Sequence, residues 1–149
     1  MKAEPFLISS TLNCILAQRL VRKLCPKKEK YFLKEPELEN IAKYCNLDKV
    51  LKILKEEKIV PPKAGWKNIP FYRPKKSEEC PEGYKGRIGI FEVLPVTETI
   101  KELIANRATS DEIQEQAKKE GMRIIIEDGF VKAAQGITSI EEVLRVIIE

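Results

Sequence analysis

The spacing of hydrophobic residues predicts a chain that is mostly helical. In several stretches apolar residues recur three or four positions apart, which places them on one face of a helix. Leucine occupies every fourth position from Leu12 to Leu24, and Pro26 follows. Because proline cannot continue a helix, we expect an amphipathic helix over Ser10–Leu24 that ends there. Hydroxyl side chains at its start provide candidate N-caps: Ser9, Ser10 and Thr11.

A helical hairpin is predicted between a charged connector and a proline-rich segment. The connector, residues 26–36, is rich in lysine and is interpreted as a solvated surface. Residues 59–80 carry four of the nine prolines and are expected to be an irregular loop. Between them lie two apolar stripes with helical spacing: Leu38, Ile41, Ala42 and Cys45, then Leu47, Val50, Leu51 and Leu54. We expect three aromatic side chains to pin the proline-rich loop to the fold: Trp66, Phe71 and Tyr72.

The C-terminal half begins with a β element and continues with helices. Residues 84–96 contain β-forming residues between Gly86 and Pro95, which predicts one strand or a hairpin arm. Helices are expected at 97–105, 109–120, 125–134 and 138–148. Their start signals are the Thr97 cap and two capping boxes, Thr109 with Glu112 and Thr138 with Glu141. The expected fold class is therefore mostly α with a small β element, an α+β protein.

Length, composition and charge favour a soluble cytoplasmic domain. The 149 residues are 43% hydrophobic, which is enough for a core. No apolar run approaches the length of a membrane span, and the N-terminal MKAEPFLISST is too polar for a signal peptide. The net charge of +4 comes from interleaved lysine and glutamate. Nucleic acid is therefore a weak candidate partner. Salt-dependent binding to DNA would be needed to support it.

The residues that are absent exclude most catalytic chemistry. The chain has no histidine, which removes imidazole catalysis and histidine metal ligands. None of its seven glycines lies in a phosphate-binding loop or a dinucleotide-binding motif. We assign no catalytic and no cofactor-binding residue. Four cysteines contain no C-x-x-C pair and are expected to be reduced in a cytosolic chain: Cys14, Cys25, Cys45 and Cys80.

Several segments, in order along nearly the whole chain, resemble the type II secretion and type IV pilus assembly ATPases. FLISSTLNCILAQRLVRKLC at Phe6–Cys25, with the specific core LAQRLVRKLCP, is similar to a segment of the family's RecA-like motor domain. GYKGRIGIFEVLPV at Gly83–Val96 resembles its GYxGRxGIxE signature. KELI at Lys101–Ile104 and GMRIIIEDGFVKAAQGITSIEEVLRV at Gly121–Val146 resemble its C-terminal end.

The resemblance implies the C-terminal portion of a RecA-like motor domain from a hexameric ATPase. Its phosphate-binding loop and acidic metal-binding residues belong to an upstream half, so ATP and Mg are expected there and no cofactor is expected in this chain. The implied partners are that upstream half, neighbouring motor subunits and the inner-membrane platform protein. The implied segments are 1–25 from the end of the RecA-like core, 26–82 as a helical and irregular insert at the position of a zinc module, and 83–149 as the β element with C-terminal helices.

The cysteine pattern departs from the family's four-cysteine zinc module. That module has one C-x-x-C after the LAQRL segment and a second before the GYxGR signature. Here Cys25 matches a ligand position, but Lys28 stands three residues later, and Cys80 alone represents the second pair. Because a protonated lysine cannot replace a thiolate, zinc binding is not expected. We expect apolar packing of the helical hairpin and the aromatic residues to hold this insert instead.

Three arginines are candidate subunit contacts. Fixed guanidinium groups suit phosphate and carboxylate partners, so Arg19, Arg22 and Arg87 are expected either to face a neighbouring subunit or nucleotide, or to form ion pairs within the chain. For Arg87 the second possibility includes a pair with Glu92 or with a helix end.

Two functions remain open on the sequence. The first is the structural and subunit-contact part of a hexameric motor at the inner membrane. The second is a stand-alone interaction module that binds such a motor or its platform protein without hydrolysis. Met1 directly precedes family-like residues, which is compatible with an independent short protein and with an excised fragment.

Overall fold

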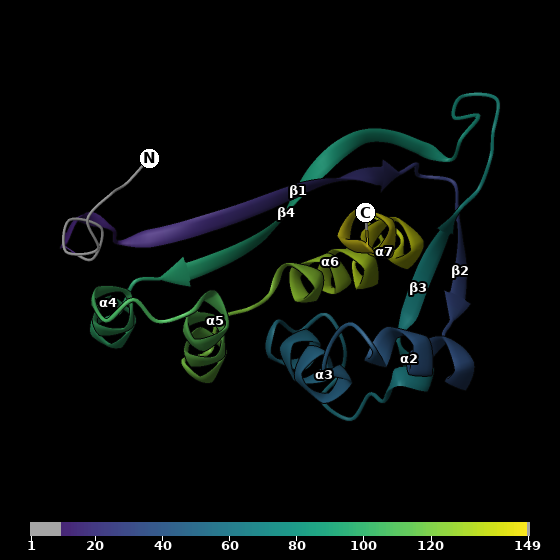
Figure 1. Ribbon diagram of the computed structural model, residues 1–149. Helices are drawn as coiled ribbons and strands as arrows, with labels where there is room; N and C mark the ends of the chain where they lie inside the picture. Colours follow the sequence, from purple (N-terminus) through teal and green to yellow (C-terminus); the bar gives the residue numbers. More distant parts are fainter. Residues whose placement is uncertain (1–9, 149) are drawn as a thin grey trace. The chain divides into compact units, whose positions relative to one another are not determined.

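The computed structural model describes residues 10–148, which divide into two compact units (Figure 1). In this range unit 1 comprises residues 10–18 and 91–124, and unit 2 comprises residues 19–90 and 125–148. Two long strands, β1 (Cys14–Leu24) and β4 (Tyr84–Pro95), pair in a two-stranded sheet and each runs through both units. The protein is thus an α+β structure, as expected from the sequence.

Unit 1 packs two short helices into its own core. These helices are α4 (Glu98–Ala105) and α5 (Ser110–Lys119). Thr97 accepts a hydrogen bond from the backbone N–H of Ile100, and Thr109 forms a capping box with Glu112, so both predicted start signals are confirmed. The buried residues of the core are Val96, Ile100, Ala117 and Met122.

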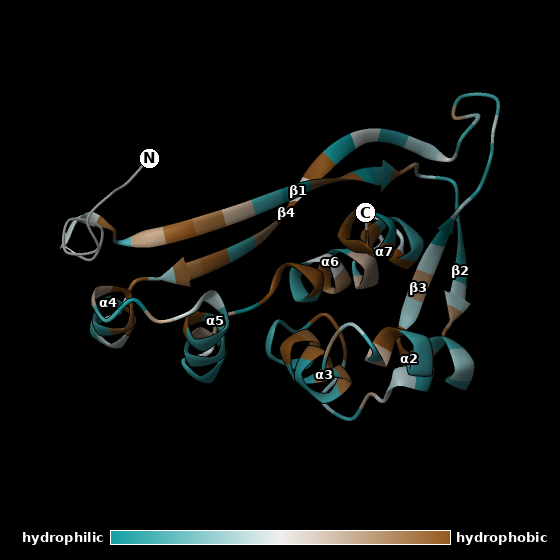
Figure 2. Ribbon diagram, in the orientation of Figure 1, coloured by the Kyte–Doolittle hydropathy of each residue, from teal (hydrophilic) through white to brown (hydrophobic). Residues whose placement is uncertain are grey.

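Unit 2 is built around helix α6. Two of its helices are α6 (Ile125–Ala134) and α7 (Ile140–Ile148), which combine hydrophobic (brown) and hydrophilic (teal) residues in Figure 2. Helix α6 packs against α7, against α3 (Leu47–Glu56) and against strand β3 (Pro70–Pro74). Together with α2 (Glu35–Ala42), α3 forms the predicted helical hairpin. A short 3₁₀ helix, η1 (Trp66–Asn68), precedes β3.

The helix predicted over Ser10–Leu24 is wrong, because most of that stretch is strand β1. A repeat of four residues is also a multiple of two, so it fits one face of a strand as well as one face of a helix. The pairing partner β4 begins about 60 residues later, where local periodicity gives no sign of it. Of the three expected capping residues, Ser9 lies outside the described part of the chain.

The connector and the proline-rich loop also contain unexpected strands. Strand β2 (Lys28–Phe32) pairs antiparallel with β3, with Tyr31 opposite Phe71. Residues 10–148 therefore hold four strands in two sheets rather than one small β element. Because β3 lies in a proline-rich stretch and β2 is highly charged, neither shows the alternation typical of a half-buried strand.

The aromatic cluster has a different third member from the expected one. Trp66 stacks on Phe71 with ring centroids 6.5 Å apart, and Tyr31 lies 6.4 Å from Phe71. Successive side chains of a strand point to opposite faces, so Tyr72 turns away from Phe71. The Tyr72 ring instead receives the ammonium of Lys28 at 4.8 Å.

The last helix begins one residue later than its predicted capping box. Ser139, not Thr138, accepts the hydrogen bond from the backbone N–H of Glu142 and is the N-cap of α7. Thr138 instead donates to the carbonyl oxygen of Arg22, which ties this turn to β1. Among the helices found in residues 10–148, none has the length and apolar content needed to cross a bilayer.

Two glycines are required by close backbone approaches. Gly83, in the GYxGR segment, has a φ of +76°, and a Cβ there would lie 2.6 Å from the Cβ of Pro74. Gly129 lies inside α6, where a Cβ would lie 2.5 Å from a methyl group of Val143 on α7. The packing of α6 on α7 therefore depends on the missing side chain of Gly129.

We expect Gly129→Ala to lower the free energy of unfolding by about 1–3 kcal/mol, because the added methyl overpacks the contact with Val143. This loss outweighs the gain of roughly 1 kcal/mol that alanine brings inside a helix. Urea denaturation would measure it. The control is Gly65→Ala, where a Cβ meets nothing within 4 Å and the change should stay within about 0.5 kcal/mol. Equal stability of both variants would contradict the packing argument.

Candidate functional site

Unit 2 contains a surface hollow lined by arginines, with a volume of about 380 Å³. All three arginines singled out from the sequence line it, and a fourth, Arg145, joins them. No spacing along the sequence connects Arg145 with the others. The residues of this arginine hollow are Arg19, Leu20, Arg22, Arg87, Arg145 and Val146.

Three elements far apart in the sequence bring these side chains together. Arg19 and Arg22 lie on β1, Arg87 lies on β4 and Arg145 lies on α7. A small apolar core fixes the three elements within unit 2, since it contains one buried residue from each of them. Those residues are Val21, Ile90 and Val146.

A buried carboxylate, Glu142, anchors two of the four arginines. Its side chain is about 1% exposed. Arg22 donates from Nε to Oε1 at 3.1 Å and from Nη2 to Oε2 at 2.9 Å, and its backbone N–H also donates to Oε1 at 3.1 Å. Arg145 donates from Nη2 to Oε1 at 2.8 Å and from Nε to Oε2 at 3.1 Å. Such paired bonds fix the planes of both guanidinium groups.

Charge complementarity keeps this cluster ionised. Burial by itself raises the pKa of Glu142, but the hydrogen bonds from Arg145 and Arg22 outweigh it and lower that pKa to about 2. The hydrogen bond to Glu142 in turn raises the pKa of Arg22 above its ordinary value. The carboxylate and its two arginines therefore stay charged at neutral pH.

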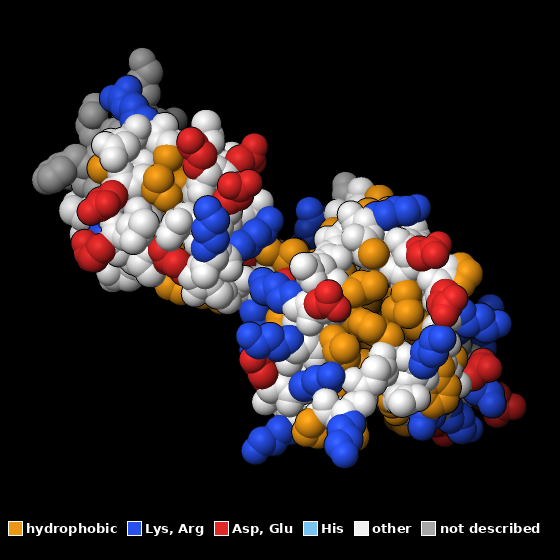
Figure 3. All heavy atoms as spheres, turned by 90° about the horizontal axis from the view of Figure 1, so that it is seen from below, with side chains coloured by type: hydrophobic (Ala, Val, Ile, Leu, Met, Phe, Trp, Pro, Cys, Tyr) orange, Lys and Arg blue, Asp and Glu red, His pale blue; other side chains and the backbone are white. Residues whose placement is uncertain are grey.

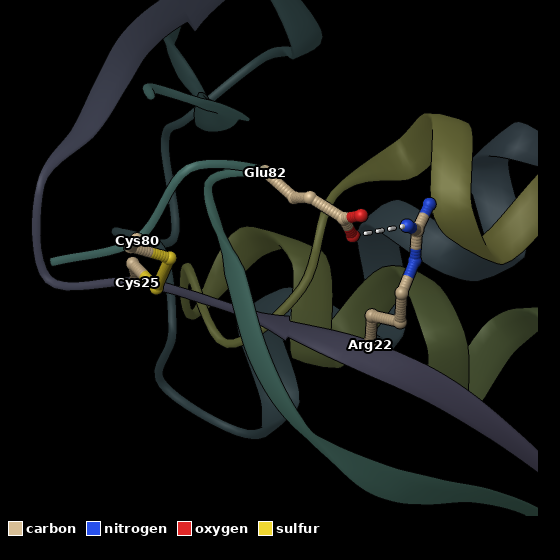
Figure 4. Close-up of a disulfide and its surroundings, with 4 residues drawn as sticks. All are labelled: Arg22, Cys25, Cys80 and Glu82. Atoms are coloured by element: carbon tan, nitrogen blue, oxygen red, sulfur yellow. Dashed lines mark ion pairs between the residues drawn. A yellow bond between two sulfur atoms is a disulfide. The ribbon is translucent and has the colours of Figure 1, made fainter. Parts of the chain in front are cut away.

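Arg22 is also held from its other sides. Its guanidinium carbon lies 4.4 Å from the ring centroid of Tyr84, whose hydroxyl shares a hydrogen bond of 2.7 Å with the Ser139 hydroxyl. Figure 4 shows Glu82 reaching toward the same guanidinium, with Oε2 3.5 Å from Nη1. Arg22 is therefore chiefly a structural residue of unit 2, which corresponds to the ion-pair alternative.

Arg19 and Arg87 differ from the anchored pair. Arg19 donates from Nη1 to the carbonyl oxygen of Val146. In the described part of unit 2, neither Arg19 nor Arg87 has a carboxylate partner, and both side chains are exposed. The pair suggested between Arg87 and Glu92 stays a prediction, because Glu92 belongs to unit 1. The hollow thus presents two guanidinium groups whose charge is not neutralised within their unit.

Charge accumulates on the whole of unit 2. Counted in the sequence over residues 19–90 and 125–149, it carries 21 of the 27 Lys and Arg residues and 15 of the 23 Asp and Glu residues, a formal charge of +6. The rest of the sequence, residues 1–18 and 91–124, carries the remaining 6 and 8, a formal charge of −2. The face drawn in Figure 3 shows an orange, apolar patch with blue Lys and Arg side chains around it. A positive field of this kind raises the local concentration of anions.

The two cysteines at remnant zinc positions form a disulfide (Figure 4). Cys25 follows β1 and Cys80 precedes β4, and both are buried. The expectation that all four cysteines are reduced is therefore wrong for this pair, while Cys14 and Cys45 are free. A separation of 55 residues gives no pairing signal in a sequence. Burial and then Glu127 raise the pKa of Cys45 to about 11, so this thiol stays protonated.

The donor set at this position does not fit a four-thiolate zinc site. The disulfide uses both sulfur atoms, and Lys28 occupies the place of another ligand. Lys28 donates from Nζ to the carbonyl oxygen of Gly136 at 2.6 Å and lies over Tyr72, so it takes part in the packing of unit 2. In residues 10–148, three or more metal-binding side chains do not gather anywhere.

Cutting the disulfide should destabilise the protein. Closing a loop of this length is worth up to about 4 kcal/mol, because the bond restricts the unfolded chain. We expect the double variant Cys25→Ser with Cys80→Ser to unfold at lower urea concentration and to lose its response to dithiothreitol. Cys14→Ser is the control, since Cys14 is an exposed free thiol. Four reactive thiols in the denatured, unreduced parent would show that the bond is absent.

Glu142 should make stability depend on pH. Its folded-state pKa of about 2 lies below the unfolded value of about 4.3, so the stabilisation is complete above about pH 5 and is lost as the pH falls toward 2. We expect Glu142→Gln to lower the free energy of unfolding at pH 7 by about 3 kcal/mol and to flatten this pH dependence.

Urea denaturation at pH 7, 5 and 3 would measure both effects. The matched control is Glu141→Gln, which removes the neighbouring carboxylate. That carboxylate is 52% exposed and pairs with Arg73, so its loss should lower the free energy of unfolding by less than about 1 kcal/mol. Equal losses for the two variants would mean that Glu142 is not the anchor.

Comparisons with known proteins place nearly the whole chain within one family. The sequence model described as type II/IV secretion system protein matches residues 1–145. The type II secretion system protein E of Xanthomonas campestris is 38% identical over 146 residues, which cover 98% of this chain and 23% of that protein. The type IV pilus assembly ATPase PilB of Pseudomonas aeruginosa is also 38% identical, over 148 residues covering 98% and 23%.

A third relative extends the match to both ends of the chain. The type II secretion system ATPase E of Vibrio cholerae is 40% identical over 155 aligned positions, which cover 100% of this chain and 26% of that protein. The chain therefore spans about a quarter of the length of these curated relatives. The resemblance noted from the sequence motifs is confirmed, and the chain belongs to the type II/IV secretion system protein family.

Proposed function

We propose that this chain is the C-terminal structural and subunit-contact part of a hexameric, RecA-like ATPase that powers type II secretion or type IV pilus assembly. The observation that carries the proposal is the family match over residues 1–145 of a chain that contains no phosphate-binding loop. ATP and Mg would bind to the upstream half, and this part would hold no zinc. The assembled motor would work in the cytoplasm, next to the platform protein of the inner membrane.

Exposed apolar side chains in unit 1 support a role in assembly. Ile15 and Leu16 on β1, and Phe91 and Val93 on β4, are each between 37% and 56% exposed. Several large apolar side chains on one short stretch of paired strands are unusual for a surface that meets only water. Because neighbouring strand residues point to opposite faces, these side chains expose apolar area on both faces of the paired strands, and we assign that area to contacts with the upstream half of the motor.

The arginines of the hollow supply candidate contacts on unit 2. Arg22 is occupied by Glu142, whereas Arg19 and Arg87 direct unneutralised charge at the surface. Arg19 and Arg87 are therefore the stronger candidates for contact with a neighbouring motor subunit, and Arg22 supports them from within the fold.

A chimera tests the proposal. The matching C-terminal segment of the Pseudomonas aeruginosa pilus ATPase would be replaced by this chain, and the purified chimera examined for ATP hydrolysis and for mass in solution. We expect a hexamer that hydrolyses ATP, while this chain alone hydrolyses none. Arg19→Glu combined with Arg87→Glu should lower the ATPase rate by at least about tenfold, equivalent to about 1.4 kcal/mol. Arg107→Glu, an exposed arginine of unit 1, is the matched control.

The outcomes separate the candidate functions. A folded chimera that neither assembles nor hydrolyses ATP would contradict the motor-part proposal and favour the stand-alone interaction module. Hydrolysis by this chain alone would contradict both. Equal ATPase rates for the Arg19→Glu/Arg87→Glu double variant and for Arg107→Glu would show that the arginine hollow takes no part in the subunit contact.

A further inference from the structure

We propose that the Cys25–Cys80 pair is a site of reversible thiol–disulfide exchange with a small thiol that carries carboxylate groups. The proposal rests on the geometry of unit 2 and does not depend on the motor function proposed above. The bonded sulfur atoms join the end of β1 to the segment that precedes β4 (Figure 4). Both cysteines line a surface hollow of about 320 Å³, which we call the disulfide hollow.

The disulfide hollow gives a small molecule a path to the sulfur atoms. Cys25 and Cys80 are only 3% and 5% exposed, so a protein-sized reductant finds little sulfur surface to contact. The hollow itself falls within the range of about 300–1,000 Å³ typical of small-molecule sites. The rest of its lining consists of Pro26, Lys27, Ser77, Glu79 and Lys85. This access favours a thiol of tripeptide size or smaller.

The charge around the disulfide hollow favours an anionic thiol. Two lysines, Lys27 and Lys85, line it beside a single carboxylate, that of Glu79. An adjoining hollow of about 500 Å³ shares Lys27 and Glu79 and adds three more charged residues: Lys75, Lys76 and Glu78. Within residues 10–148, no ion pair joins any of these four lysines to a carboxylate. Their charge attracts an anion and also stabilises the thiolate that leaves when the disulfide opens.

Backbone hydrogen bonds hold the two cysteines together whether or not the sulfur atoms are bonded. The N–H of Cys25 donates to the carbonyl oxygen of Gly83 at 3.0 Å, and the N–H of Gly83 donates to the carbonyl oxygen of Cys80 at 3.0 Å. Ser77 and Cys80 also exchange two backbone hydrogen bonds of 3.0 Å. Two thiols kept this close have a high effective concentration toward each other, which favours closure of the bond after each opening.

The exchange balances in two steps. The small thiol loses its proton to solvent, and its thiolate attacks one sulfur atom of the pair. A bond to the small molecule forms, the Cys25–Cys80 bond breaks, and its electron pair stays on the other cysteine, which leaves as a thiolate. A second small thiolate then attacks the mixed disulfide, so the small molecule departs as its own disulfide and both cysteines are reduced. In the reverse direction, that disulfide accepts the two electrons and closes the bond again.

Reduction rates of the folded chain by two thiols would test the charge preference. Glutathione has a net negative charge, whereas 2-mercaptoethanol is neutral. Each would act at equal thiolate concentration, in about 0.1 M salt where charges interact over about 10 Å, on a Cys14→Ser protein that lacks the exposed free thiol. Alkylation and mass spectrometry would follow the opening of the disulfide.

The variant that tests the lysines is Lys27→Gln combined with Lys85→Gln. We expect the ratio of the glutathione rate to the 2-mercaptoethanol rate to fall at least about threefold. Attraction of the anion is lost for glutathione alone, whereas the effect on the leaving thiolate is common to both reagents and cancels in the ratio.

Lys43→Gln combined with Lys63→Gln is the matched control. Both lysines are exposed, belong to unit 2 and lie outside the lining of the two hollows. This double variant loses the same formal charge, so a change in its rate ratio of less than about 1.5-fold is expected from screening by salt.

Single cysteine variants would trap the mixed disulfide. In the Cys14→Ser background, Cys25→Ser leaves Cys80 without its partner, and Cys80→Ser leaves Cys25. After incubation with glutathione disulfide, each variant should carry one glutathionyl group on the remaining cysteine of the pair. Cys45 is the internal control, because it is buried and protonated and should stay unmodified. Cooperative urea denaturation would show that the variants are folded, and the rate comparison with the intact pair does not depend on them.

Three results would overturn the proposal: reduction by glutathione only after the chain unfolds in urea, an equal fall of the rate ratio in the two lysine double variants, or no glutathionyl group on a folded single variant. These results leave the chimera experiment untouched. A working chimera whose disulfide resists glutathione would refute the exchange site alone, and exchange together with a silent chimera would refute the motor part alone.

Discussion

The arrangement of unit 2 depends on one buried charge. Glu142 lies in the first turn of helix α7, and its carboxylate accepts hydrogen bonds from both side-chain and backbone donors of Arg22 on β1, about 120 residues earlier in the chain. A charge so deeply buried persists only when it is paired and hydrogen-bonded. The same carboxylate orients Arg145, and Ser139 links the helix start to Tyr84. One residue thus joins the first strand, the last helix and the arginine hollow.

Local signals in the sequence were sufficient for the helices and insufficient for the strands. Thr97 and Thr109 act on backbone N–H groups only three residues away, so the sequence alone located α4 and α5. Strand β1 depends on a partner about 60 residues further along, and its leucine repeat fits either period. Strands β2 and β3 were missed for a different reason, since lysine and proline occupy positions where strands usually carry β-branched residues.

The candidate site was predicted in part. Arg19, Arg22 and Arg87 were recognised within family-like motifs, and the structure places them around one hollow. The motifs could not show that Arg22 is bound to a carboxylate whereas Arg19 and Arg87 are not, because Glu142 and Arg145 come close to these arginines only through tertiary packing. Cys25 and Cys80 were likewise recognised as remnant zinc positions, but their bond became evident only where β1 ends beside the start of β4. The residue types indicated which side chains could form ion pairs or sulfur bonds. Which of them do so in the folded protein depends on the long-range pairing of the strands.

The disulfide closes the insert, residues 26–79, by a covalent bond rather than by a bound metal. A four-thiolate zinc clip, as the family resemblance implies, closes when metal is supplied and opens when a chelator removes it. The Cys25–Cys80 bond forms when two electrons and two protons leave the thiols, and it opens when a dithiol returns them. Reduction of this bond would therefore remove the covalent closure of residues 26–79. The closure of this segment is thus a matter of thiol chemistry within the chain, through one bond between Cys25 and Cys80.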